Sequence, residues 1–439
     1  MKNFLAFTIC AAVLCSCASR SSSTAQSKAS FNIGSFATVG KSLSSYEDFT
    51  LYAESLDGFV ADSALASCAN PLLLKALKDC NIPYAPEDSV EALASVFNHA
   101  KRLMDSIVTV DTHCDFPEIR YYHPEAGYDI AASQSPCQVS IEKMRQGHLA
   151  AVHMAVWMRP PGNDPLDEKG IAGAPAVMWD FIDRIDAHFA QYSDLCGIAR
   201  TYEDALALKR QGKKAFFYAL ENAYWIGRDL SNLQKLADRG FTYITLSHWG
   251  DNIFCHSCDR SEDPSKGLTE LGRELVKEMN RLGLVIDLSH TSYGTWQDVL
   301  ALSEAPVVFT HSGAAAVYKH QRNVDDGTLR ALAANGGVLQ VYIVQSFMGE
   351  GKGENVGLAE MVEHICHAVE VAGIDHVGVG LDFDGGGGGV GFNGANDAVN
   401  LTVALLEKGF SDEDIAKIWG GNYFRVLSEV QARAARARQ

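Results

Sequence analysis

Two histidines each follow a short apolar run in the C-terminal half of the chain. The runs are Leu284–Leu288 and Pro306–Phe309, and they lead to His290 and His311. Between them, Tyr293–Ser303 has apolar side chains at helical spacing, which predicts a strand–helix–strand unit. The parallel strands of such units end at one edge of a sheet, where functional sites are built. Either histidine alone is better explained as a core residue, but the repetition predicts a shared site.

Other apolar runs also end in side chains that bind metals or move protons. His113 and Asp115 follow the first run, and extended chain places them on one face with Cys114 on the other. Further runs lead to the following residues: Glu221, His248 and Asp382. Each of these side chains, taken alone, is also explained as a helix cap, a turn residue or a stacked core group.

Gathered at one edge, these four imidazoles and at least three carboxylates would be costly to desolvate without a compensating cation. The set therefore predicts a pair of divalent metal ions. Imidazole and carboxylate ligands without a required thiolate suit Zn²⁺, so we expect two zinc ions as cofactors. The ions Mn²⁺, Co²⁺ and Fe²⁺ are alternatives, because they accept the same ligands.

Strand-like and helix-like segments alternate from His99 onward. The candidate strands are 107–110, 149–157, 215–220, 243–246, 284–288, 306–309, 338–344 and 377–381. The candidate helices are 176–192, 202–211, 233–239, 268–282, 293–303, 325–335 and 358–372. This alternation predicts an α/β fold, a (β/α)8 TIM-like barrel over residues 101–439. A doubly wound open sheet is the alternative, although the Gly-rich phosphate loop of a nucleotide-binding sheet is absent after the first strand.

The residues before the barrel indicate export. An apolar run at 4–15 follows Lys2; it has the length of a signal-peptide core and is too short to span a bilayer. Leu14 and the small residues before Cys17 resemble a bacterial lipobox, which implies a signal peptide at 1–16 and a lipid on Cys17. An ordinary signal peptide cleaved nearby is the alternative. Residues 17–30 are predicted to be a Ser-rich tether, and 31–100 a mainly helical N-terminal extension.

Charge limits the partners of the chain. Its 439 residues carry a formal net charge of −17, and no basic patch is interleaved with aromatic residues. This balance argues against nucleic acid and anionic membrane surfaces as partners. We expect an exported protein of the bacterial cell envelope, on its periplasmic or cell-surface side, that meets the membrane only through its N-terminal lipid. The sequence does not fix the oligomeric state, so a homodimer stays open.

Five motifs together resemble the membrane dipeptidase (renal dipeptidase) family, zinc peptidases related to the amidohydrolase barrels. They are D-T-H-C-D-F-P at 111–117, L-E-N at 220–222, L-S-H-W-G-D-N at 246–252, N-R-L-G-L-V-I-D-L-S-H at 280–290 and G-L-D-F-D-G at 380–385. The spacing of eleven residues from His311 to Arg322 also matches. The resemblance spans roughly His99 to Leu427. Asn222 departs from it, because many members have glycine there, and the Pro- and Gly-rich segment 157–175 is a candidate lid.

The resemblance implies a binuclear zinc site with a water or hydroxide between the metals as nucleophile. One zinc ion would bind His113, Asp115 and Glu221, and the other would bind His290, His311 and the same Glu221. His248 and Arg322 would contact substrate, and Asp382 would transfer protons. Asp287, close before His290, is either a partner that orients an imidazole or a buried polar group at a strand end.

These expectations predict hydrolysis of the peptide bond of dipeptides. The guanidinium of Arg322 can bind a carboxylate through two hydrogen bonds, which selects a short substrate with a free α-carboxylate. An ion pair of Arg322 with Asp325 or Asp326 is the structural alternative. Two other functions stay open: an amidase acting on N-acyl amino acids, β-lactams or cyclic amides, and a non-catalytic peptide-binding lipoprotein. The presence of all five predicted ligands argues against the second.

Overall fold

The computed structural model describes residues 89–122, 128–132, 135–159, 166–261, 263–350 and 356–437. The predicted signal peptide, the lipid site at Cys17, the tether and all but the end of the 31–100 extension lie outside these residues and stay predictions. Helix α6 (Ser89–Ser106) is the described part of that extension, and it continues past residue 100. The barrel lies within the compact unit Leu103–Gln439.

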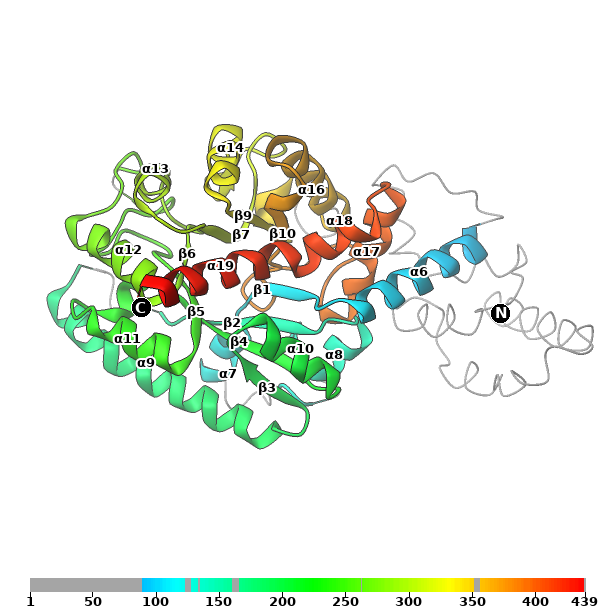
Figure 1. Cartoon of the computed structure of the whole chain (residues 1–439), viewed down its shortest axis with the longest axis horizontal. Helices are drawn as coiled ribbons and strands as arrows, with labels where there is room; N and C mark the ends of the chain where they lie inside the picture. The colour runs from blue at the N-terminus through cyan, green and yellow to red at the C-terminus, as the bar shows by residue number, and fades with distance from the viewer. Residues whose placement is uncertain are drawn as a thin grey trace, which may run out of the picture. The chain divides into compact units, whose positions relative to one another are not determined.

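Eight parallel strands form the wall of a barrel, in the order β1-β2-β4-β5-β6-β7-β9-β10 (Figure 1). Their bounds are β1 Val110–Cys114, β2 Ala151–Val156, β4 Lys214–Glu221, β5 Phe241–Thr245, β6 Val285–Asp287, β7 Val308–Ala314, β9 Val338–Val341 and β10 Val377–Val379. Backbone hydrogen bonds beyond β10 close the ring: the Asp382 amide donates to His113 O (3.1 Å), and the Asp115 amide donates to Phe383 O (2.9 Å). The predicted TIM-like barrel is confirmed, and the open sheet is excluded.

Helices surround this wall and cross one end of it (Figure 1). They are α7 Phe116–Tyr122, α8 Ile141–Gln146, α9 Glu168–Phe189, α10 Tyr202–Arg210, α11 Ser231–Arg239, α12 Glu270–Leu282, α13 Tyr293–Leu302, α14 Asp326–Asn335, α15 Gln345–Met348, α16 Leu358–Ala372, α17 Ala398–Glu407, α18 Asp412–Ala416 and α19 Asn422–Ala437. The sequence explains their ends: Thr269, Ser292 and Asp325 cap α12, α13 and α14. Gly283 and Gly336, both left-handed, end α12 and α14. Among the described residues, no helix is long and apolar enough to cross a membrane.

The structure differs from the predicted elements in several places, and it adds helices that were not predicted, among them α7, α8, α17, α18 and α19. Strand β1 covers Val110–Cys114, so His113 lies within the strand and not after it. Helix α9 begins at Glu168 and contains Pro175, so the end of the candidate lid segment is helical. Two short strands were not predicted: β3 (Cys196–Ala199) pairs with β4, and β8 (Asn323–Val324) pairs with β7, both outside the main ring. Strands of two to four residues carry too little periodicity to be predicted.

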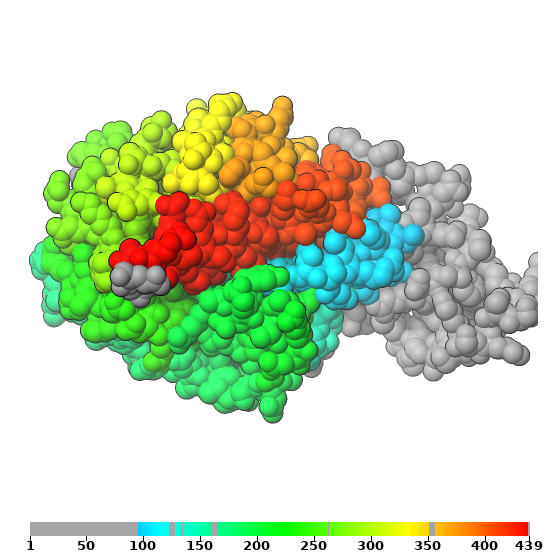
Figure 2. Space-filling model, in the orientation of Figure 1, coloured from blue at the N-terminus to red at the C-terminus, as the bar shows by residue number. Residues whose placement is uncertain are grey.

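Helix α19 fills the amino-terminal end of the barrel. Its buried side chains belong to the same apolar cluster as the residues that begin the strands; the helix side chains are Tyr423, Phe424, Val426, Leu427 and Val430, and the strand residues include Val110, Ala151, Val285, Val308 and Val338. Each valine, leucine or phenylalanine side chain among them contributes about 1.5–3 kcal/mol when fully buried. Figure 2 shows α19, in red, crossing this face of the molecule. The carboxyl end of the barrel is thus left for a functional site.

A buried carboxyl group next to α17 makes stability depend on pH. Burial raises the pKa of Asp397 from 3.8 to about 6, although the Asn393 amide donates a hydrogen bond to it. The folded chain therefore holds this proton between about pH 4 and pH 6, where the unfolded chain has lost it. Protonated Asp397 therefore contributes fully to stability below pH 4, and this contribution is lost as the pH rises through about 6. The free energy of unfolding changes by about 3 kcal/mol as a result.

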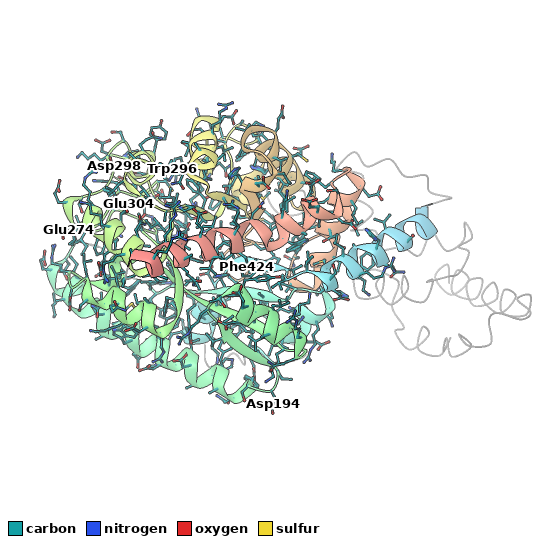
Figure 3. The ribbon with its side chains drawn as sticks, in the orientation of Figure 1. Asp194, Glu274, Trp296, Asp298, Glu304 and Phe424 are labelled. Atoms are coloured by element: carbon teal, nitrogen blue, oxygen red, sulfur yellow. The ribbon has the colours of Figure 1, made fainter. Side chains whose placement is uncertain are left out.

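We expect Asp397→Asn to remove this share of the pH dependence. Urea denaturation at pH 4.5 and pH 7.5 measures the free energy of unfolding of both chains. From the lower to the higher pH, this free energy should fall by about 2–3 kcal/mol more in the parent chain than in the variant. Asp194→Asn is the matched control, because Asp194 lies at the surface (Figure 3) and should change nothing. Parallel pH profiles for Asp397→Asn and the parent chain would contradict the assignment.

Candidate metal centre and active site

The predicted ligands and proton carriers converge at the carboxyl ends of the strands. Three overlapping groups each have their ligand atoms within 4.8 Å of one another: His113 with Glu221 and His311, Glu221 with His248 and His290, and His113 with Asp115 and Asp382. They come from β1, β4 and β7 and from the segments that follow β1, β5, β6 and β10. The structure therefore brings together all seven of these side chains.

Glu221, the last residue of β4, lies at the centre of this cluster. Its Oε2 is 3.5 Å from His113 Nε2, and its Oε1 is 3.2 Å from His290 Nε2 and 3.5 Å from His311 Nε2. Asp115 Oδ2 is also 3.5 Å from His113 Nε2. The two carboxylate oxygens of Glu221 thus face two different groups of ligands. This is the arrangement that a carboxylate shared between two metal ions requires.

Two buried imidazole nitrogens test whether the residues fit a metal. Nε2 of His113 and Nε2 of His311 have no hydrogen-bond partner in the described part of the chain. The opposite nitrogens are bound: His113 Nδ1 lies 2.9 Å from the Tyr243 hydroxyl, and His311 Nδ1 lies 2.9 Å from Thr310 Oγ1. An unpartnered buried nitrogen is costly unless it binds something. The free nitrogens, together with Glu221 and Asp115, form a nitrogen and oxygen donor set that suits zinc.

Burial perturbs the titration of the cluster when no cation is present. It raises the pKa of Glu221 and of Asp115, and it raises that of Asp382 to about 7. It lowers the pKa of His290 and of His311 well below the ordinary value. Burial also opposes the charge of His113, but Tyr243, Glu221 and Asp115 outweigh it and raise the pKa of this imidazole well above the ordinary value. A bound dication favours ionised carboxylates and neutral imidazoles.

Left-handed backbone recurs where the strands end. His290 has φ 65° and Asp382 has φ 59°, conformations that few residues other than glycine adopt. Asn222, with φ 80°, explains the departure from the glycine of many family members, since asparagine tolerates this region well. Its Oδ1 accepts hydrogen bonds from the Tyr224 amide (3.1 Å) and from Asn252 Nδ2 (2.8 Å). These contacts fix the chain directly after Glu221.

Gly385 packs directly against the acidic side of the site. A Cβ at this position would lie 2.0 Å from Asp115 Oδ2 and 2.6 Å from Asp382 Oδ1. Any other residue would displace one of these carboxylates. The first glycine of the 385–389 run is therefore required by close approach of the backbone to the site.

Arg322 and His248 complete the site. Arg322 is only 1% exposed; it donates to Ser312 Oγ (3.2 Å) and to His311 O (2.9 Å), while its Nε has no partner among the described residues. Asp325 instead caps α14 through backbone amides, and Asp326 pairs with His367 and Arg330, so the predicted alternative ion pairs are not formed.

His248 lies in an aromatic surround. Its ring is 4.2 Å from that of His290, 5.0 Å from that of Trp157 and 5.2 Å from that of Trp249, centroid to centroid. Burial, aided by the charge of Arg322, lowers its pKa well below the ordinary value. A neutral imidazole in this place can donate a hydrogen bond to a substrate.

Sequence reasoning missed two residues of the cluster, Tyr243 and Thr310, and left the role of Asp287 open. Tyr243 and Thr245 alternate on β5, and Thr310 directly precedes His311. Two features of the sequence could have indicated these residues. One is the alternation of residues along β5, and the other is the presence of polar side chains within largely apolar strands.

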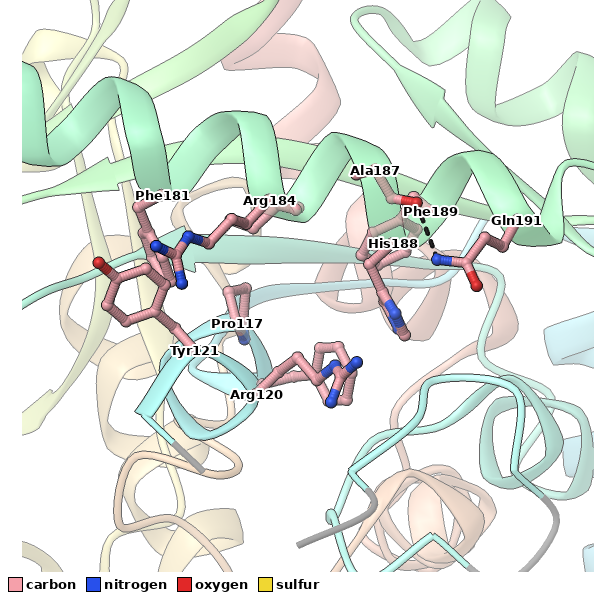
Figure 4. A pocket seen from close by; sticks show the side chains of 11 residues that line it. Pro117, Arg120, Tyr121, Phe181, Arg184, Ala187, His188, Phe189 and Gln191 are labelled. Atoms are coloured by element: carbon pink, nitrogen blue, oxygen red, sulfur yellow. Dashed lines mark hydrogen bonds between the residues drawn. The ribbon is translucent and has the colours of Figure 1, made fainter. Parts of the chain in front are cut away.

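A separate pocket of about 280 Å³ lies between α7 and α9 (Figure 4). It is lined by Phe116, Pro117, Arg120, Tyr121, Phe181, Arg184, Ile185, Ala187, His188, Phe189 and Gln191. The Arg184 guanidinium lies 4.9 Å from the ring centroid of Tyr121. None of the predicted ligands lines this pocket, so it is distinct from the metal centre.

Comparison with known proteins decides the family. The sequence model of the membrane dipeptidase family (peptidase family M19) matches residues 97–439. The chain belongs to this family. A dipeptidase of Clonostachys rogersoniana, verJ, is 33% identical over 341 residues, which cover 76% of this chain and 86% of that protein. Membership confirms the resemblance seen in the motifs and makes the chain a hydrolase of the metallopeptidase class.

Solved structures agree with this placement. The probable dipeptidase PvdM of Pseudomonas aeruginosa is 27% identical and superposes with a TM-score of 0.71, covering 77% of this chain and 99% of that one. The metallo peptidase dipeptidase AC is 26% identical, with a TM-score of 0.67, covering 74% of this chain and 99% of that one. Both similarities support the barrel fold of this membrane dipeptidase family member.

Proposed function

We propose that the chain is a zinc-dependent dipeptidase whose two metal ions share Glu221. The observation that carries the proposal is the position of this side chain, with Oε2 facing His113 and Oε1 facing His290 and His311. One ion would be held by His113, Asp115 and Glu221, and the other by Glu221, His290 and His311. When bound, the two ions would supply an activated bridging water or hydroxide and polarise the substrate carbonyl. Other divalent ions fit the same donors.

The chain's own groups supply the remaining steps of peptide-bond hydrolysis. His248 lies next to His290 and is placed to donate a hydrogen bond to the oxyanion that develops on the carbonyl. The carboxyl group of Asp382 lies beside that of Asp115. From there it would take a proton from the attacking water and give it to the leaving nitrogen.

Arg322 would make the enzyme selective for short substrates. Two of its N–H groups hold Ser312 and His311, which fixes the guanidinium, and its Nε–H is unused. A guanidinium has five N–H donors, so donors remain for a carboxylate. A free α-carboxylate bound there would set the length of the substrate.

Arg322→Lys should weaken the binding of dipeptides, because an ammonium group cannot form the paired hydrogen bonds. We expect kcat/KM for dipeptides to fall about 10- to 100-fold, mainly through KM. The same change should matter little for dipeptide amides and N-acyl amino acid amides, which lack the carboxylate. Ser312→Ala is the control, because it removes one contact of Arg322 and keeps the guanidinium. Equal losses on dipeptides and on their amides would rule out the carboxylate contact.

We propose further that the mature chain begins at Cys17, carries lipid there and is exported to the bacterial cell envelope. The support is the apolar run at 4–15 and the small residues that precede Cys17. Mass spectrometry of the membrane fraction should find an acylated Cys17, and Cys17→Ser should leave the protein without lipid. An unmodified mature N-terminus elsewhere would contradict this proposal.

A further inference from the structure

We propose that Tyr243 and Thr310 are positioning residues that hold His113 and His311 in one tautomer, so that each presents a bare Nε2 to its metal ion. The inference rests on the proposed metal function and concerns residues outside the ligand set. It follows from the direction of the hydrogen bonds around the two imidazoles.

The bond of Tyr243 has only one direction. The Tyr243 hydroxyl lies 2.9 Å from the Thr112 carbonyl oxygen, which can only accept, so its single hydrogen points there. The same hydroxyl oxygen lies 2.9 Å from His113 Nδ1 and must therefore accept from an Nδ1–H. In the neutral ring the lone pair is then on Nε2, which is buried, unpartnered and 3.5 Å from Glu221 Oε2. Tyr243 itself is fully buried.

Thr310 acts on His311 in the same way, with Asp287 in the place of the carbonyl. Thr310 Oγ1 lies 2.6 Å from Asp287 Oδ2, and a carboxylate can only accept. The one hydroxyl hydrogen is thus committed, and Oγ1 accepts from His311 Nδ1–H at 2.9 Å. Nε2 of His311 is again buried, unpartnered and 3.5 Å from Glu221.

Asp287 is itself held in place by three further donors. They are the amides of Ser289 (3.0 Å) and Thr310 (2.8 Å) and the hydroxyl of Thr245 (2.5 Å). Asp287 is fully buried, and its hydrogen bond with Thr310 Oγ1 links it to the ring of His311. Asp287 therefore orients the imidazole of His311 indirectly, through Thr310. Each hydroxyl oxygen accepts a hydrogen bond from Nδ1–H of its histidine. The lone pair on Nε2 is therefore available to a metal ion.

Binding of cobalt to the metal-free full chain tests this inference without measuring catalysis. Co²⁺ fits the same donors as zinc and gives a visible spectrum. The unsubstituted chain should bind two ions. Tyr243→Phe and Thr310→Val should each weaken one of the two sites about 10- to 100-fold and spare the other, and the double variant should weaken both. Thr310→Ser, which keeps the hydroxyl, should bind like the parent chain.

Matched controls separate orientation from general loss of packing. Tyr423→Phe removes another buried hydroxyl that contacts an imidazole, that of His153, outside the ligand set. Thr242→Val removes a buried threonine hydroxyl on β5 that bonds Tyr218 O. Both controls should retain two cobalt sites of unchanged affinity.

Two results would overturn the inference in different ways. A parent chain that binds two ions, with both sites unchanged in Tyr243→Phe and Thr310→Val or equally weakened in the controls, would refute the positioning role alone. A parent chain that binds no cobalt would refute the proposed metal function and this inference with it.

Discussion

Replacing Glu221 with glutamine is expected to abolish dipeptide hydrolysis and to empty both metal sites at once. The neutral amide has one oxygen, whereas the carboxylate offers Oε2 toward His113 and Oε1 toward His290 and His311. Metal ions stabilise the transition state by several kcal/mol, and each 1.36 kcal/mol is about tenfold in rate. The loss in kcat/KM should thus be on the order of 10³-fold or more.

Metal analysis of the purified Glu221→Gln variant should accompany the rate. Both ions should be depleted together, because in the proposed arrangement one side chain serves both sites. Glu304→Gln is the control, since Glu304 lies at the surface (Figure 3) and should retain metal and rate. If Glu221→Gln kept two ions and full activity, Glu221 would not be the shared ligand.

Replacing Asp382 with asparagine should produce a different failure, in which metal is kept and rate is lost. The amide of the Asp382→Asn variant cannot carry the proton from water to the leaving nitrogen, so kcat should fall about 10²- to 10⁴-fold, as for other general acid–base groups. The loss should be smaller for substrates whose leaving amine is weakly basic, because such an amine needs less help from a proton donor.

The pattern across substrates distinguishes this role from a ligand role. Metal content of Asp382→Asn should stay at the parent level, whereas Asp115→Asn, which alters the ligand beside it, should lose metal. An equal fall in rate for strongly and weakly basic leaving amines would show that Asp382 does not transfer the proton. A loss of metal would show that Asp382 also holds a metal ion.

Much of the fold, and the gathering of the candidate ligands at one end of it, could be predicted because local pattern carries it. The mainly apolar runs 284–288 and 306–309 contain β6 and the start of β7, and His290 and His311 follow closely after them. Parallel strands of one barrel must end on one face, so local pattern and topology together bring distant ligands to one site. The prediction needed no knowledge of side-chain contacts.

The parts that could not be predicted depend on register between strands. Tyr243 and His113 are separated by 130 positions, and only the pairing of β1, β2, β4 and β5 brings them to hydrogen-bond distance. The link from Asp287 to His311 passes through Thr310, a residue that looks like any strand threonine. The start of α9 was hidden by Pro175, which usually ends a helix and here lies inside one.

The central claim, that this chain hydrolyses dipeptides with two metal ions sharing Glu221, is tested most directly by titrating metal back into the chelated full chain. Bound metal and the rate of dipeptide hydrolysis are measured on the same samples. We expect no hydrolysis without metal, and a rate that rises until two equivalents are bound and then stays constant. Full hydrolysis by the metal-free chain, or a maximal rate with a single ion bound, would contradict it.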